Sequence, residues 1–289
     1  MNPLPNDGEI IFTEEGHEYT VYGEKIDRSC TGVVGSYFAP FDPVANTNKF
    51  YAGWQREYDR GNTAHKYYAI IHDTLERGGD HDDAAAAIRA SWEAEGAKAA
   101  RLGTLLHLHC EYDLNADALA PDAEIWNEIE QFNEFKASTW VQDLGLRPYR
   151  TELCVGWRVG GQSVSAGQID ALYIDEAGLY YIIDFKRVKH TTILDPDKAA
   201  TRQGFKGARA LPPISHVPDT HYQHYSLQTS IYNLMLRNTT AIDVEDRMFL
   251  VRMHVDRLHV EIVKCHDLRT EAKVLLEAEH ARLTTTATG

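Results

Sequence analysis

The sequence has little cysteine and no long apolar stretch. Its four cysteines, Cys30, Cys110, Cys154 and Cys265, are scattered, and no two of them form a CxxC pair. We therefore expect free thiols in a reducing compartment, and neither a structural zinc site nor an iron–sulfur cluster. No apolar segment approaches the roughly 20 residues that a membrane-spanning helix needs, so we expect no membrane partner.

The N-terminus lacks the basic start and the apolar stretch of a signal peptide, which predicts an intracellular location. An excess of basic residues is also lacking, because 29 Lys and Arg stand against 43 Asp and Glu, a net charge of −14. This charge argues against a non-specific nucleic-acid coat protein. It does not exclude an enzyme that acts on nucleic acid, since such an enzyme needs only a local positive groove and its metal site requires carboxylates.

The order of apolar patterns predicts one α/β domain with a mixed central sheet flanked by helices. Residues 1–80 are expected to form an N-terminal β-hairpin (9–24), a helix beginning at Ser29 or Thr31, and a helical elaboration. Further helices are expected over 84–94, 97–114, 121–138, 220–237 and 266–283. Strands are expected over 149–159 and 168–187, with a turn at 175–178, and as a hairpin over 246–264.

Two carboxylates and a lysine are expected to meet at the ends of two neighbouring strands. Residues two apart in a strand share a face, so Asp184 and Lys186 point one way, while the apolar residues around them pack on the other side. Asp170 lies on the preceding strand, and a hairpin centred near Ala177 places it opposite Asp184. The alternative is a hairpin with surface charges, because an Asp-x-Lys match is common by chance.

Paired carboxylates repel each other unless a cation neutralises them. Oxygen ligands of this kind suit Mg²⁺ or Mn²⁺, hard ions that also bind phosphate. Such an ion can polarise a scissile phosphate and lower the pKa of an attacking water. Lys186 could orient that water, or take its proton if the pKa of the lysine is depressed.

Two helical motifs flank this pair of strands. Gly103, His107 and Glu111 are spaced by four and share one helix face, where Gly103 would permit close backbone approach. His107 could be a metal ligand or a phosphate contact, and the alternative is a core histidine on an amphipathic helix. Gln228 and Tyr232 also share a helix face, a pattern that is weak when taken alone.

The motifs GTxxHxxxE, GxxD, DxK and QxxxY occur in this order between Gly103 and Tyr232. This order resembles the PD-(D/E)XK nuclease superfamily, in its RecB and lambda-exonuclease-like branch of phage, giant-virus and organelle exonucleases. The resemblance implies a restriction-endonuclease-like core over 97–235 and metal-dependent hydrolysis of DNA in recombination, repair or replication. An exonuclease acting from DNA ends is favoured. A restriction-like or structure-specific endonuclease and a catalytically silent DNA-binding module stay open.

The resemblance also implies roles for single residues. One or two Mg²⁺ or Mn²⁺ ions would be bound by His107, Asp170, Asp184 and the backbone carbonyl of Phe185. Lys186 would act on the water, with Glu152 as a second-metal or water-positioning residue and Gln228 as a support for Lys186. DNA would be contacted by Arg28, Ser29, Thr31 and Tyr232.

A basic segment follows the DxK strand. Residues 186–209 hold seven Lys or Arg and two Asp, a charge of +5 in a chain of −14. We expect it to contact the phosphate backbone through Arg187, Lys198, Arg202 and Lys206. The alternative is a solvated charged loop. DNA is the expected partner, while a separate single-strand annealing or helicase protein and an oligomer stay open.

Overall fold

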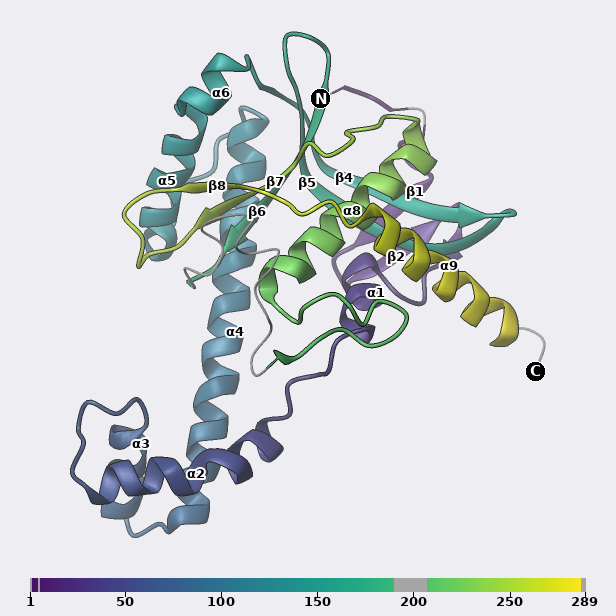
Figure 1. Ribbon diagram of the computed structural model, residues 1–289. Coiled ribbons are helices and arrows are strands. Elements are labelled where there is room, and N and C mark those ends of the chain that lie inside the picture. The colour runs from purple at the N-terminus through teal and green to yellow at the C-terminus, as the bar shows by residue number, and fades with distance from the viewer. Residues whose placement is uncertain (1, 5, 190–206, 287–289) are drawn as a thin grey trace. The chain divides into compact units, whose positions relative to one another are not determined.

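The computed structural model describes residues 2–4, 6–189 and 207–286 (Figure 1). The chain divides into two compact units, one made of Met1–Ala39 with Leu105–Gly289 and the other of Pro40–Thr104. All four cysteines are free, as predicted. Within the described ranges, no helix combines the length and apolar character needed to cross a membrane.

The first unit is built on a five-stranded sheet. Its strands, in spatial order, are β4 (Arg147–Val159), β5 (Gln162–Ile174), β6 (Tyr180–Arg187), β7 (Met248–Met253) and β8 (Glu261–Lys264). All neighbours are antiparallel except β6 and β7, which are parallel. A parallel pair needs a crossover connection, and here it includes α8 (His221–Thr240). The predicted mixed sheet is confirmed.

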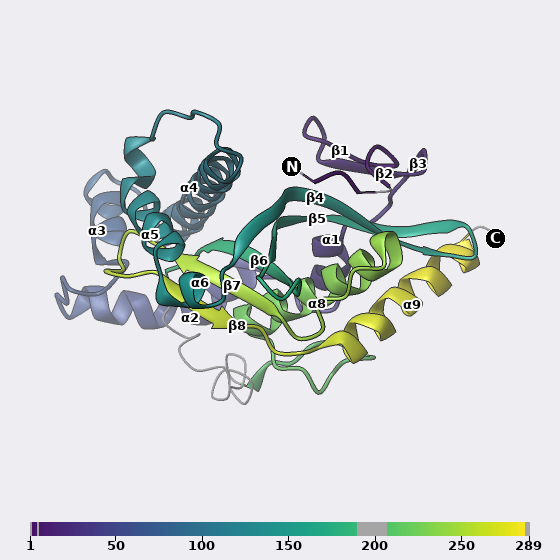
Figure 2. The same ribbon diagram turned by 90° about the horizontal axis from the view of Figure 1, so that it is seen from above.

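Helices cover both faces of this sheet (Figure 2). On one face lie η1 (Ala123–Ile125), α5 (Trp126–Lys136) and α6 (Thr139–Asp143). There the rings of Phe132 and Phe135 pack on the ring of Phe185, and their centroids lie 5.4 and 6.1 Å, respectively, from the Phe185 centroid. The other face carries α1 (Cys30–Ser36), α8 and α9 (Arg269–Thr286) around the main core. Lys186 lies on that second face over the ring of Tyr225 in α8, so the predicted alternation along β6 is confirmed.

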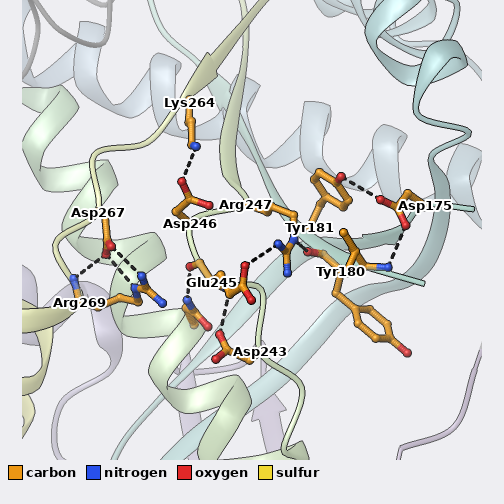
Figure 3. Close-up of polar contacts among 12 residues, drawn as sticks. Asp175, Tyr180, Tyr181, Asp243, Glu245, Asp246, Arg247, Lys264, Asp267 and Arg269 are labelled. Carbon is orange, nitrogen blue, oxygen red and sulfur yellow. Dashed lines mark hydrogen bonds and ion pairs between the residues drawn. The ribbon is translucent and has the colours of Figure 1, made fainter. Parts of the chain in front are cut away.

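Polar contacts fix the end of β6 that lies away from Lys186 (Figure 3). The carboxylate of Asp175 accepts hydrogen bonds from the Leu179 amide at 2.8 Å and the Tyr181 hydroxyl at 2.9 Å. Arg247 donates to the Tyr180 carbonyl at 3.0 Å, and so ties the start of β6 to the segment before β7. These bonds hold the turn and the strand starts in register.

The N-terminal segment forms a small separate sheet of β1 (Ile10–Thr13), β2 (Glu18–Val21) and β3 (Glu24–Lys25). The antiparallel pairing of β1 with β2 confirms the predicted hairpin. Ser29 then caps α1, because its side chain accepts a hydrogen bond from the amide of Gly32. The predicted helix start is therefore confirmed.

The second unit contains α2 (Pro43–Asp59), α3 (Tyr68–Glu76) and the first part of α4 (His81–Leu114). The prediction of two helices over 84–114 was wrong, because α4 is continuous. The side chain of Asp80 caps its start, and the run of good helix formers outweighs the cost of about 1 kcal/mol for the interior Gly96.

Candidate metal centre

The candidate site lies where β5 and β6 separate. The last residue pair between these strands is Ala171↔Ile183, which confirms the predicted hairpin centre near Ala177. One step further along the same register, Asp170 and Asp184 stand opposite each other. There the amide of Phe185 donates to Oδ2 of Asp170 at 2.7 Å, so a carboxylate replaces a strand carbonyl as the acceptor.

Three side chains from three elements converge at this point. Ligand atoms of His107 on α4, Glu152 on β4 and Asp170 on β5 all lie within 4.8 Å of one another, the one such group found among the residues that the structure describes. Nδ1 of His107 is 3.6 Å from Oδ1 of Asp170, and Nε2 lies 2.8 Å from the carbonyl oxygen of Phe185, to which it can donate. The His107 side chain thus belongs to the site rather than to the core.

The backbone at Glu152 is locally distorted. Its φ of +44° falls in the left-handed region, which a non-glycine residue rarely adopts within a strand. Glu152 lies between the pairs Thr151↔Ala171 and Leu153↔Ile169, and therefore opposite Asp170. A conformation of this kind costs on the order of 1–3 kcal/mol and is typical of ligand sites. Here it accompanies the approach of the Glu152 carboxylate to Asp170.

Asp184 is buried beside this group and is paired with Lys186. It is 1% exposed, and its Oδ2 lies 2.8 Å from Nζ of Lys186. Its Oδ1 has no hydrogen-bond donor among the described residues. Burial, opposed by the charge of Lys186 and reinforced by that of Asp170, raises the pKa of Asp184 to about 6.

Lys186 is held as an ammonium ion. Burial favours its neutral form, but the charges of Asp184 and Asp170 outweigh burial and raise the pKa of Lys186. Its Nζ also lies 5.2 Å from the ring centroid of Tyr225. Tyr225 was not predicted from the sequence, although its position three residues before Gln228 on a helix could have indicated it.

The donor set fits a divalent cation. Three carboxylates, those of Glu152, Asp170 and Asp184, converge with one imidazole, and Lys186 is the positive charge paired with them. A buried carboxylate oxygen without a donor is a group that a metal ion would satisfy. His107, which the resemblance to PD-(D/E)XK nucleases implied as a metal ligand, adds a nitrogen donor to these oxygen atoms.

Burial and the charges of Asp170, Glu111 and Asp184 raise the pKa of Glu152 from 4.5 to about 9. Between these pH values the folded, metal-free protein binds a proton that the unfolded chain does not bind. The stability of the metal-free protein is therefore expected to fall as pH rises through this window. Thermal unfolding in chelator at pH 5, 7 and 9 measures this dependence. Glu152→Gln should flatten it, and an equally steep dependence in that variant would contradict the assignment.

Gln228 and Tyr232 share a face of α8 as predicted, and Nε2 of Gln228 donates to the Tyr232 hydroxyl at 2.8 Å. Tyr232 is 5% exposed and lies in the main core. Gly167 of the GxxD motif makes room for this ring, because a Cβ at Gly167 would lie 2.6 Å from Cε1 of Tyr232. We therefore assign Tyr232 to packing beneath the site rather than to DNA contact.

Gly167→Ala is expected to lower stability by about 1–3 kcal/mol, the usual cost of overpacking a core. The added methyl group would also lie 3.0 Å from Cβ of Cys30, so the Tyr232 ring must move and the contact with Cys30 must relax. Gly103→Ala is the matched control, since no described atom outside its own helix lies within 4 Å of a Cβ there, contrary to the predicted close approach. That variant should be neutral or stabilising. Denaturant unfolding of both variants measures the difference, and equal stabilities would contradict it.

The residues assigned to DNA contact have varied surroundings. Arg28 pairs with Glu279 at 3.3 Å, and the hydroxyls of Ser29 and Thr31 lie 3.0 Å apart at the start of α1. Nε of Arg187 pairs with buried Glu128 at 2.8 Å, and its side chain is 9% exposed. We therefore do not propose Arg187 as a DNA contact. Lys198, Arg202 and Lys206 lie outside the described residues.

Comparison with known proteins identifies no family. No family model and no curated protein matches the chain. Among solved structures, the crystal structure of SSO0001 is similar, with a TM-score of 0.29 and 16% sequence identity. The match covers 55% of this chain and 60% of that chain, so the two share only part of their lengths. A likeness of this extent carries no conclusion about fold family or function.

Proposed function

We propose that the chain is a divalent-metal-dependent deoxyribonuclease with a restriction-endonuclease-like core, acting as an exonuclease from DNA ends. One arrangement supports this proposal above all others. A group of His107, Glu152 and Asp170 lies beside the ion pair of buried Asp184 and half-buried Lys186, at the point where two strands separate. Residues that could hold a metal ion beside a lysine can together polarise a phosphodiester and orient an attacking water.

The residues divide into two sets by role. His107, Glu152 and Asp170, with Asp184 and the carbonyl of Phe185 beside them, would hold the ion. A divalent ion at this place would polarise the scissile phosphate and lower the pKa of the attacking water. Lys186 would orient the water or the phosphate through its ammonium group, since its raised pKa disfavours the role of general base. The mixed donor set favours Mn²⁺ over Mg²⁺.

A digest of end-labelled linear DNA and covalently closed circular DNA with Mn²⁺ tests the proposal. We expect progressive loss of the linear DNA, while the circles survive. Asp170→Asn, which keeps the side-chain shape but removes one charge, should be inactive on both. Nicking or linearisation of the circles would favour the endonuclease. Absence of cleavage on double-stranded, single-stranded and circular DNA would contradict the nuclease assignment.

A further inference from the structure

The second unit contains a cavity that the proposed nuclease chemistry does not use. Its volume is about 530 Å³, and all of its lining residues lie between positions 40 and 104. Five of the eight lining residues are aromatic, and the lining consists of Phe41, Asn46, Phe50, Trp54, Tyr67, Trp92, Glu95 and Gly96. A cavity with this much aromatic surface, joined by one carboxylate and one amide, has the composition of a ligand site.

The aromatic walls meet at steep angles. The ring of Trp92 lies at 88° to Trp54, 68° to Phe41 and 65° to Tyr67, with centroids 5.5–6.1 Å apart. A hydrogen bond of 3.0 Å from Nε1 of Trp92 to the Tyr67 hydroxyl fixes one of these corners. Rings at these angles can contact a compact group from more than one side.

The charge of the lining favours a cation. Glu95 supplies a carboxylate, and no lysine or arginine belongs to the lining. The protein already places an ammonium group at this edge, because Nζ of Lys66 lies 3.7 Å from Glu95 and 5.1 Å from the ring centroid of Tyr67. Lys49 lies over Phe50 in the same way, at 5.5 Å. Aromatic faces attract cations through their quadrupole, and a nearby carboxylate adds to that attraction.

We infer that this cavity binds an organic cation, an alkylammonium or guanidinium group. The group can belong to a free amine or to a lysine or arginine side chain of a partner protein. Lys66, which is 60% exposed, is the internal competitor for Glu95. The inference does not rest on the nuclease proposal, because none of the lining residues belongs to the metal centre.

Isothermal titration calorimetry of the intact protein with tetramethylammonium tests the inference. We expect saturable binding of tetramethylammonium, and tighter binding of choline than of its neutral isostere 3,3-dimethylbutan-1-ol. Glu95→Gln, which removes the charge, should weaken binding of the cation about two- to fivefold. Phe41→Leu should do the same, since Phe41 is 65% exposed and its loss leaves the fold intact. Glu93→Gln, on the same helix but outside the lining, is the matched control and should bind as the wild type does.

The variant Lys66→Met distinguishes a pocket that binds cations from one that binds nucleic acid. Removal of the competing ammonium should tighten binding of tetramethylammonium, whereas it would weaken binding of an anionic oligonucleotide. Basic peptides, with and without trimethyllysine, then distinguish a partner side chain from a free amine. No saturable binding, equal affinity for choline and its neutral isostere, or an oligonucleotide that binds through Lys66 would each overturn the inference. Metal-dependent DNA cleavage should be unchanged in Glu95→Gln.

Discussion

Lys186→Ala is expected to lower the rate of DNA cleavage by about 10²–10³-fold, the range typical of losing one preorganised group that stabilises charge in the transition state. The side chain of Lys186 is 16% exposed, and its Nζ lies 2.8 Å from Oδ2 of buried Asp184. The site would keep His107, Glu152 and Asp170, so calorimetry should still detect binding of Mn²⁺. A loss of rate without loss of metal binding separates the role of Lys186 from that of the ligands.

Two controls keep this result interpretable. Removing Lys186 leaves Asp184 without its paired cation, which costs about 3–5 kcal/mol for a buried pair unless the carboxylate takes up a proton. Thermal unfolding must therefore accompany the kinetics, at a temperature where the variant is folded. Lys189→Ala is the matched variant, because Lys189 is exposed and its one ion pair among the described residues is with exposed Asp256. If folded Lys186→Ala cleaved DNA at the wild-type rate, the catalytic strand would be wrongly assigned.

Strand geometry allowed part of the site to be predicted from the sequence, namely the face shared by Asp184 and Lys186 and the register of the β5–β6 hairpin. The two-residue period of β6 places Asp184 and Lys186 on one face, and the position of the turn sets the register of Ala171 opposite Ile183. Both are local properties of a hairpin. The apolar face of α5 could also be predicted from the sequence, because helical spacing places Phe132 and Phe135 on one face, and both rings are buried.

What the sequence could not predict depends on contacts between distant segments. The distortion at Glu152 lies opposite Asp170 on the neighbouring strand, and no local pattern indicates a positive φ there. The burial of Arg187 depends on Glu128, which lies 59 positions earlier in the chain on α5. Charge alone suggested that Arg187 contacts DNA, but an internal partner determines its position.

Metal dependence is expected to be complete. Excess chelator should abolish cleavage, because without an ion the carboxylates of Glu152, Asp170 and Asp184 repel one another and the raised pKa of Glu152 keeps a proton in the site. Addition of Mn²⁺ should restore cleavage, and Mg²⁺ should restore it less well, since an imidazole among the ligands suits Mn²⁺ better. The resemblance to metal-dependent nucleases implies that Ca²⁺ binds but supports little turnover.

Measuring the melting temperature with and without Mn²⁺ detects binding of the ion to the folded chain independently of catalysis. Any ion that binds only the folded chain stabilises it, by about 2.7 kcal/mol at a concentration one hundred times its Kd. Mn²⁺ should therefore raise the melting temperature, and it should do so more at pH 8 than at pH 6, because binding must displace the proton on Glu152. Asp170→Asn should lose both the stabilisation and the cleavage. Undiminished cleavage in chelator, or equal stabilisation of Asp170→Asn by Mn²⁺, would show that the ion binds elsewhere and that these carboxylates have another role.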